Sequence, residues 1–239
     1  MALQKHTFPT NKKPVKVIVP LITNESVSIY ITGYDPFNPN TEFFSRKIIV
    51  TGTDKVEFNC PQSPRTLKVI IWSDGNKKFT VPKIEVVPLV INFNMTEDEK
   101  KDIRLIERFA RIAGRIPARR MYYYPGAKFK IEYLPVILKD NGMEHPTPAR
   151  MHTQLPLMQA SRKHFIKYTV PQRVAILCHE YAHNFMNINQ DNEIEADNNM
   201  IRLYEGLGYP RLEAVYAFTD VMNDTNVNVQ RVGNIMNKL

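Results

Sequence analysis

One five-residue stretch constrains this chain more than any other, and it reads His179-Glu180-Tyr181-Ala182-His183. In an α-helix, residues four positions apart lie on the same face, so His179 and His183 can direct two imidazole nitrogens toward one metal ion. Glu180 lies next to that face, where its carboxylate can take a proton from a water molecule held by the metal. The stretch therefore predicts a helix that carries two metal ligands and a general base.

The flanking residues predict where this helix begins and ends. Thr169 and Gln172 have the spacing of a capping box, and a proline stands in the first turn between them. The run 174–178 is apolar almost all round, which is typical of a buried helix. The polar cluster 187–192 then favours a turn, so we expect the helix to end about one turn after the second histidine.

The residues after this turn predict a second helix, antiparallel to the first. Asn192 is a favourable N-cap residue, and Glu195 follows three positions later, so the two can cap the helix together. The midpoint of the turn falls near Ile188. In an antiparallel helix pair, residues at equal distances from the turn lie side by side.

This rule pairs Glu193 with His183 and Asp197 with His179. Glu193 is therefore predicted to be a third metal ligand. Asp197 lies one turn further along the same helix face, where it can accept the other ring N–H of His179 and fix its tautomer. Glu195 points elsewhere, and capping is its expected role.

Together the two helices resemble the gluzincin pattern HExxH…ExxAD, because His-Glu-Tyr-Ala-His is followed by Glu-Ile-Glu-Ala-Asp. That pattern belongs to the HtpX and CAAX-protease group, and a close variant belongs to the ImmA/IrrE group. The resemblance implies a zincin-like zinc metalloendopeptidase, in which His179, His183 and Glu193 bind Zn²⁺ and Glu180 is the general base. Asp197 corresponds to the aspartate of the pattern.

The resemblance covers roughly residues 165–210 and departs from those families in one spacing. Only nine residues separate His183 from Glu193, whereas the families usually insert many more. The short spacing excludes an elaborate insertion between the ligands, but the helix register accommodates it. It is too long for the metzincin arrangement, which also needs a third histidine where this chain has Asn189.

The first part of the chain has the pattern of an all-β domain. Seven short candidate strands, separated by turn residues, follow one another over residues 14–91 without a helical period. They are 15–19, 27–32, 47–50, 55–59, 66–72, 78–81 and 84–90. Asp74-Gly75, directly after a strand ending at Trp72, is the clearest hairpin signal. We expect a β-sandwich over residues 1–91 that serves as a binding or attachment domain, with residues 1–13 as a polar arm.

Residues 92–239 are expected to form the zincin-like domain, which makes the whole chain α+β. Thr96 and Glu99 have the spacing of a capping box for a long amphipathic helix that Gly114 ends. Further strands are predicted over residues 121–124, 129–138 and 150–158, and further helices over residues 211–222 and 227–237. Residues 150–158 can form an edge strand beside the motif helix, where an extended substrate could add as a further strand.

The net charge of +8 is local. Residues 100–130 contain ten Lys and Arg against two acidic residues, which is also +8. This excess is either a solvated basic helix face and loop or a docking patch for an acidic partner or nucleic acid. No recognised nucleic-acid-binding motif accompanies it.

Composition also bounds the compartment. No apolar run approaches the roughly 20 residues of a membrane span, and the first residues lack the apolar core of a signal peptide. We therefore expect a cytoplasmic or virion-associated protein without a membrane partner. Cys60 and Cys178 fall in different predicted domains, so no disulfide is expected. Cys178 is rotated by about 100° from His179 on the helix, which favours core packing over metal binding.

Two other functions remain open beside hydrolysis of a protein or peptide substrate. The chain could be a zincin-fold structural component of a larger assembly such as a phage virion, with residues 1–91 contacting an assembly partner. It could also be a regulatory protease of the ImmA/IrrE kind that cuts a repressor. The donor that would stabilise an oxyanion also stays open, and the candidates are Tyr204, Tyr209, Tyr216, His145, His152 and His164.

Overall fold

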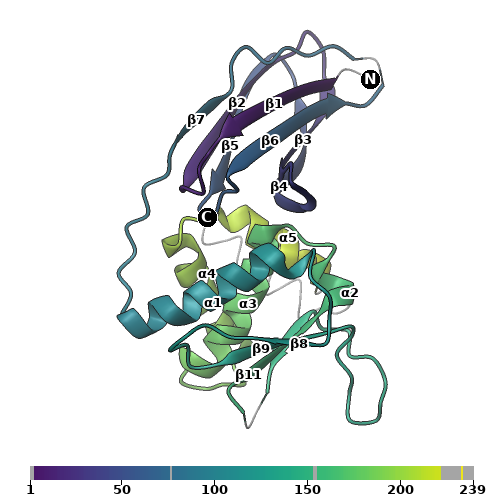
Figure 1. Ribbon diagram of the computed structural model, residues 1–239. Coiled ribbons are helices and arrows are strands. Elements are labelled where there is room, and N and C mark those ends of the chain that lie inside the picture. Colours follow the sequence, from purple (N-terminus) through teal and green to yellow (C-terminus); the bar gives the residue numbers. More distant parts are fainter. Residues whose placement is uncertain (1–2, 76, 153–154, 222–232, 234–239) are drawn as a thin grey trace. The chain divides into compact units, whose positions relative to one another are not determined.

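The computed structural model describes residues 3–75, 77–152, 155–221 and 233 (Figure 1). The described chain is mixed α and β, and it divides into two compact units, residues 1–91 and 92–239. Most of the helix predicted over residues 227–237 lies outside the described residues. Within the described part, no helix is long and apolar enough to cross a membrane.

The first unit consists of two antiparallel sheets. One sheet has the order β1-β6-β3-β4, formed by Leu3–Pro9, Thr66–Ser73, Val27–Asp35 and Asn38–Val50. The other has the order β5-β2-β7, formed by Thr53–Cys60, Val15–Ile22 and Glu85–Pro88. Buried and partly exposed residues alternate along β2, β3 and β6, so each sheet buries one face.

Aromatic packing joins the two sheets. The ring of Phe44 in β4 stacks on Phe58 of β5, with ring centroids 4.1 Å apart. Gly33 in β3 leaves the space for this ring, because a Cβ atom there would overlap Phe44. The glycine therefore serves a close approach in the core rather than a turn.

Three predictions in this unit need correction. Residues 1–13 are not an arm, because β1 within them pairs antiparallel with β6 from Leu3 to Pro9. The strand predicted at 78–81 is reduced to a single bridge between Thr80 and Ile22. By contrast, β4 is thirteen residues long, because it begins at Asn38, nine residues before the predicted strand at 47–50. Polar side chains on β1 gave no apolar alternation to recognise.

The second unit places its helices on one face of a four-stranded sheet (Figure 1). The sheet order is β10-β11-β9-β8, formed by Ala149–Met151, Leu157–Ser161, Lys130–Leu134 and Arg120–Tyr122. The helices are α1 (Glu97–Ala113), α2 (Arg162–Phe165), α3 (Val170–Phe185), α4 (Glu193–Gly206) and α5 (Arg211–Val221). Helix α3 contacts α1, α4, α5 and β10, so it lies at the centre of the unit.

The segment predicted as one edge strand over residues 150–158 is a hairpin. Its first strand, β10, pairs only with β11 and therefore forms the edge of the sheet, next to α3. The strands predicted over 121–124 and 129–138 are shorter than expected, as β8 and β9. The strand type was predicted correctly here, but the division of 150–158 into two strands and the short helix α2 were not predicted.

A buried arginine joins α1 to α3. The Arg173 guanidinium donates from Nε to the carbonyl of Phe165 (2.7 Å) and from Nη1 to the carbonyl of Ala110 (3.1 Å). Gly114 ends α1 as predicted, but its φ is −67°, which any residue adopts. Glycine is needed there because a Cβ atom would lie 2.6 Å from Nη2 of Arg173.

Candidate metal centre

Helix α3 holds the two histidines in a rigid setting. The hydroxyl of Thr169 accepts the Gln172 N–H (3.4 Å), and Oε1 of Gln172 accepts the Thr169 N–H (2.9 Å), so the predicted capping box is present. The helix is buried over most of its length. His179 is buried and His183 is half-buried, so the cluster they form lies where the helix approaches the surface.

The turn between α3 and α4 is fixed by side chains. Ile188 lies at its tip and is 98% exposed. The Glu195 carboxylate accepts the backbone N–H groups of Ile188 (2.8 Å) and Asn189 (3.3 Å). The side chain of Asn192 accepts the Glu195 N–H (3.1 Å) and caps α4, and Asn187 donates to the Asn192 carbonyl (3.0 Å). Glu195 therefore faces the turn rather than the histidines.

The side chains of three residues that could bind a metal meet between the two helices. Nε2 of His179 lies 3.0 Å from Nε2 of His183 and 3.3 Å from Oε2 of Glu193. Nε2 of His183 lies 3.6 Å from Oε1 of Glu193. These three residues form a group that could hold one metal ion. The helix register placed Glu193 beside His183 and Asp197 beside His179, and both pairs lie close together in the structure.

The size of this triangle suits a tetrahedral zinc site. With metal–ligand distances of about 2.0–2.1 Å, neighbouring ligand atoms of a tetrahedron are about 3.3–3.4 Å apart. The two Nε2 atoms are 3.0 Å apart, and each lies 3.3 or 3.6 Å from a different oxygen of the Glu193 carboxylate, so the group has about the dimensions of that tetrahedron. Two imidazole nitrogens and one carboxylate oxygen are also a donor set that zinc accepts in proteins. The residues present therefore fit a zinc ion.

The outer nitrogens of both rings have partners that orient them. Nδ1 of His179 lies 3.0 Å from Oδ1 of the buried Asp197, as the register predicted. Nδ1 of His183 lies 2.6 Å from the backbone carbonyl of Gln190, to which a ring N–H can donate. Both contacts direct Nε2 toward the space between the helices, where it could bind a metal ion. The Gln190 contact had no sequence signal, because any residue carries a backbone carbonyl.

Carboxylates dominate the electrostatics of the centre. Burial lowers the pKa of His179, but the contacts with Asp197 and Glu193 outweigh it and raise that pKa to about 9. The pKa of His183 is also raised, because the contact with Glu193 outweighs desolvation by burial. A pocket that stabilises positive charge on an imidazole stabilises a metal cation by the same interaction.

Glu180 lies between α3 and the sheet edge. Its Oε2 accepts the backbone N–H of Met151 in β10 (2.9 Å). Burial raises the pKa of the Glu180 carboxyl, and the neighbouring His179 and His183 oppose that shift. A carboxylate with a raised pKa is a stronger base than an exposed one. The Met151 contact was not predicted, although an edge strand beside the motif helix was.

Most candidate oxyanion donors are engaged elsewhere. The hydroxyl of the buried Tyr204 donates to the Pro171 carbonyl at the start of α3 (3.2 Å), and that of Tyr209 donates to Glu107 of α1 (3.1 Å). His145 accepts the Thr147 N–H through Nδ1, and His164 lies 3.8 Å from Glu144. Tyr216 is exposed on α5, and His152 directly follows the residue that contacts Glu180.

Cys178 belongs to the core and not to the ligand group. Its side chain is fully buried, and burial raises the pKa of the thiol. Cys60 is also buried, and the two cysteines lie in different units. Comparisons of the chain with family models, with curated proteins and with solved structures find no match.

Proposed function

We propose that this protein is a zinc metalloendopeptidase whose zinc ligands are His179, His183 and Glu193. The observation that carries the proposal is the meeting of the His179, His183 and Glu193 ligand groups, with separations of 3.0–3.6 Å, next to the half-buried Glu180 carboxylate on α3. The gluzincin resemblance implies the same set: two histidine ligands and a neighbouring base on one helix, and a third ligand on a second helix. We assign the gluzincin role of each residue on this basis.

The environment of the triangle favours a catalytic over a structural zinc site. Structural zinc sites are closed by four protein ligands, whereas catalytic sites use three and leave one position open. Among the residues that the structure describes, the candidate group has three members. The Glu193 side chain is 50% exposed, so solvent and substrate have access to the centre from that side.

The residues around the site have separate roles in peptide hydrolysis. A bound zinc ion would polarise the scissile carbonyl and lower the pKa of a water molecule. Glu180 accepts the proton of the attacking water at a carboxylate oxygen and transfers it to the departing amide nitrogen. Asp197 and the Gln190 carbonyl hold the two imidazoles in the orientation that the reaction requires.

The free edge of β10 is the proposed position of the substrate. The N–H of His152 donates to the Leu157 carbonyl, on the β11 side of the strand. Backbone groups alternate in direction along a strand, so the Met151 N–H points away from β11, toward Glu180. An extended peptide added along this edge would run directly past the general base.

We further propose that the two units correspond to a β-sandwich and a zincin-like domain. The two antiparallel sheets of residues 1–91, joined by the Phe44–Phe58 stack, support the first assignment. The sheet edge beside α3, with the ligands on α3 and α4, supports the second. The first unit would then serve binding or attachment.

The test of the proposed activity is cleavage of an unfolded protein by zinc-loaded wild type and by Glu180→Gln, with zinc content measured on both. Glutamine keeps the size of the side chain but cannot accept a proton. We expect Glu180→Gln to retain zinc and to lose about 10²- to 10⁴-fold in rate. Glu85→Gln, an exposed change in the first unit, is the matched control and should cleave like wild type. Equal rates for Glu180→Gln and wild type would refute the assigned role.

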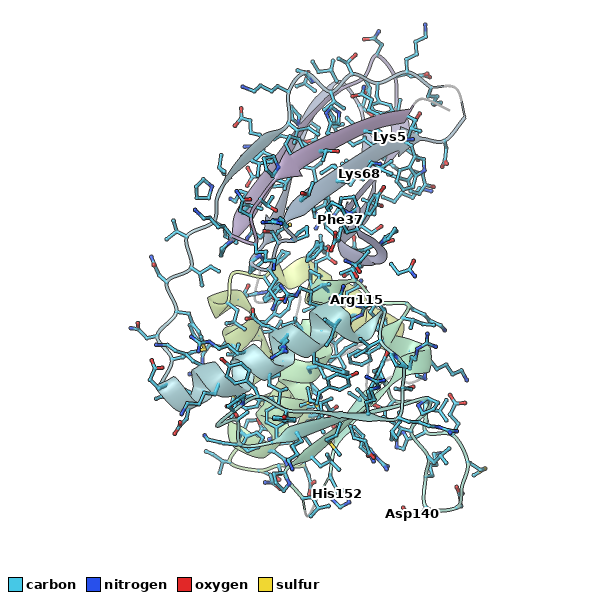
Figure 2. The ribbon with its side chains drawn as sticks, viewed as in Figure 1. Lys5, Phe37, Lys68, Arg115, Asp140 and His152 are labelled. Atoms are coloured by element: carbon cyan, nitrogen blue, oxygen red, sulfur yellow. The ribbon has the colours of Figure 1, made fainter. Side chains whose placement is uncertain are left out.

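A structural role in a larger assembly is the second candidate function. It is favoured by two large apolar side chains exposed on the first unit, Phe37 (76%, Figure 2) and Ile49 (71%), which are suited to contact a partner. In that case Glu180→Gln protein would assemble normally. Zinc-loaded wild type without any peptidase activity, together with normal assembly of the variant, would favour this function over hydrolysis.

A further inference from the structure

Helix α1 carries a row of arginines that the metal centre does not use. Arg104, Arg108 and Arg111 fall within about 60° of one another around the helix, at about 100° per residue, and Arg115 follows two residues after the helix ends at Ala113; these four form the arginine row. Arg104, Arg108 and Arg115 are exposed, and Arg111 is half-buried. Between residues 103 and 130 the chain has eight Lys and Arg and a single acidic residue, Glu107.

The acidic residue of this region does not lie in the row. Glu107 accepts a hydrogen bond from the Tyr209 hydroxyl (3.1 Å), so it is directed toward the following helices. The three acidic residues of the first turn of α1 precede the row, and two of them pair with Lys100 and Lys101. Interaction with the helix dipole favours cations only in the last turn, so it does not explain Arg104 and Arg108.

A cavity of about 380 Å³ lies directly beside the row. Arg108 lines it, together with Leu105, Phe109 and Ile112 of α1 and with Met121, Tyr122 and Tyr123. The three apolar α1 residues are offset from the arginines by about 90° around the helix, so the row borders the cavity along one side. Met121 is 47% exposed and Tyr123 is 68% exposed, which leaves apolar surface at the rim.

We propose that this surface, the arginine row with the adjoining cavity, binds an acidic segment of a partner protein that inserts one large apolar side chain into the cavity. The arginines supply planar, bidentate donors for carboxylates. The cavity supplies an apolar pocket for one anchor residue, as at the centre of many protein interfaces. The partner is therefore recognised by negative charge around a Leu- or Phe-type side chain.

The shape of the surface favours a protein segment over single-stranded nucleic acid. Bases bind to exposed aromatic faces along a basic groove. Here the Tyr122 ring is half-buried and packs at 52° against Phe109, with centroids 5.4 Å apart. Tyr122 therefore forms a wall of the cavity, and Tyr123 is the one exposed aromatic side chain among the residues that line it, whereas base stacking along a strand uses several such faces.

The proposal is independent of the metal centre, and its test involves no catalysis. The probe is a fluorescent acidic peptide of Asp and Glu with a central Phe-Leu pair, titrated with the full chain and followed by anisotropy. The matched probes replace that pair with Ser-Ser, or replace the peptide with oligothymidine of equal charge. We expect the anchored peptide to bind about tenfold more tightly than either matched probe.

Two protein variants and a charge control complete the test. Arg104→Glu/Arg108→Glu should weaken binding of the anchored peptide by about tenfold or more, because it reverses the charge at two rim positions. Met121→Ser/Tyr123→Ser changes only exposed side chains and should abolish the advantage of the anchored over the Ser-Ser peptide. Lys139→Glu, in the loop of Asp140 and far from Arg115 (Figure 2), should change affinity by less than about twofold.

Three outcomes would overturn the proposal. The first is tighter binding of oligothymidine than of the anchored peptide. The second is equal binding of the anchored and Ser-Ser peptides, which would show that charge alone explains the binding. The third is an equal loss of affinity from Lys139→Glu and from the arginine variant, which would show that net charge and not this surface attracts the probe.

Discussion

At the scale of single residues, the contact between Asp197 and His179 is the most informative. The buried Asp197 carboxylate lies 3.0 Å from Nδ1 of His179, an ion-pair distance, on the side of the ring opposite Nε2, which lies near Glu193 and His183. A carboxylate in this position also increases the basicity of the coordinating nitrogen. His183 has a weaker partner of the same kind, the Gln190 carbonyl.

We therefore expect Asp197→Ala to lower zinc affinity by about 10- to 100-fold while the protein stays folded. The affinity is measured by competition with a chromophoric chelator. Asp191→Ala is the matched control, because Asp191 is an exposed acidic residue of the turn between the same two helices. An equal loss in both variants would show that general negative charge, and not the orientation of His179, sets the affinity.

The sequence predicts which side chains meet between α3 and α4, but not the backbone groups that contact them. His179, Glu180, His183, Glu193 and Asp197 follow from helix periodicity and from the register of two antiparallel helices. Partners supplied by the backbone, such as the Gln190 carbonyl and the Met151 N–H, carry no residue-specific signal. They depend on how a turn and a sheet edge are placed in three dimensions.

At the scale of elements, Arg173 connects α3 with the ends of α1 and α2. It is buried and donates to the Ala110 and Phe165 carbonyls, which lie in the last turns of those helices. The same guanidinium occupies the space beside Gly114. A sequence rule assigns that glycine to the helix end, and only the packing shows that it accommodates an arginine.

Gly114→Ala should lower the free energy of unfolding by about 1–3 kcal/mol, because the added methyl group overlaps the guanidinium. Chemical denaturation of Gly114→Ala, Arg173→Ala and the double variant measures this. Arg173→Ala removes the overlap, so the double variant should be more stable than the sum of the two single changes implies. Strict additivity would contradict a contact between the two side chains.

Local signals also decide which elements were predicted. Capping boxes and apolar stripes gave α1 and α3, because these signals are confined to one segment. Strand β1 was missed because its side chains are mostly polar and partly exposed, and it forms through pairing with β6, far away in the sequence. The segment predicted as one strand over 150–158 instead contains residues of β10 and of β11, which pair with each other.

At the scale of the whole molecule, the two units have separate cores. The boundary between residues 91 and 92 lies where the strand-rich pattern gives way to the capped helix α1. All members of the metal group lie in the second unit. The unit that would bind zinc therefore contains every residue assigned to the centre.

A fragment of residues 92–239 should consequently fold and bind zinc without the first unit. Circular dichroism and zinc titration of the fragment measure both properties, with the full chain as reference. We expect zinc affinity within about threefold of that of the full chain, since no assigned ligand is lost. Insoluble fragments from every cut between residues 88 and 96 would contradict two independently folding units.

The most direct measurement of the metal centre is zinc content per chain in wild type, Glu193→Ala and Glu195→Ala after dialysis against a weak chelator. The two glutamates lie two positions apart on α4, but Glu193 faces the histidines and Glu195 binds the turn through Ile188 and Asn189. Wild type and Glu195→Ala should hold about one zinc ion per chain, and Glu193→Ala should lose most of it. Zinc loss in Glu195→Ala with full zinc content in Glu193→Ala would contradict the assigned centre.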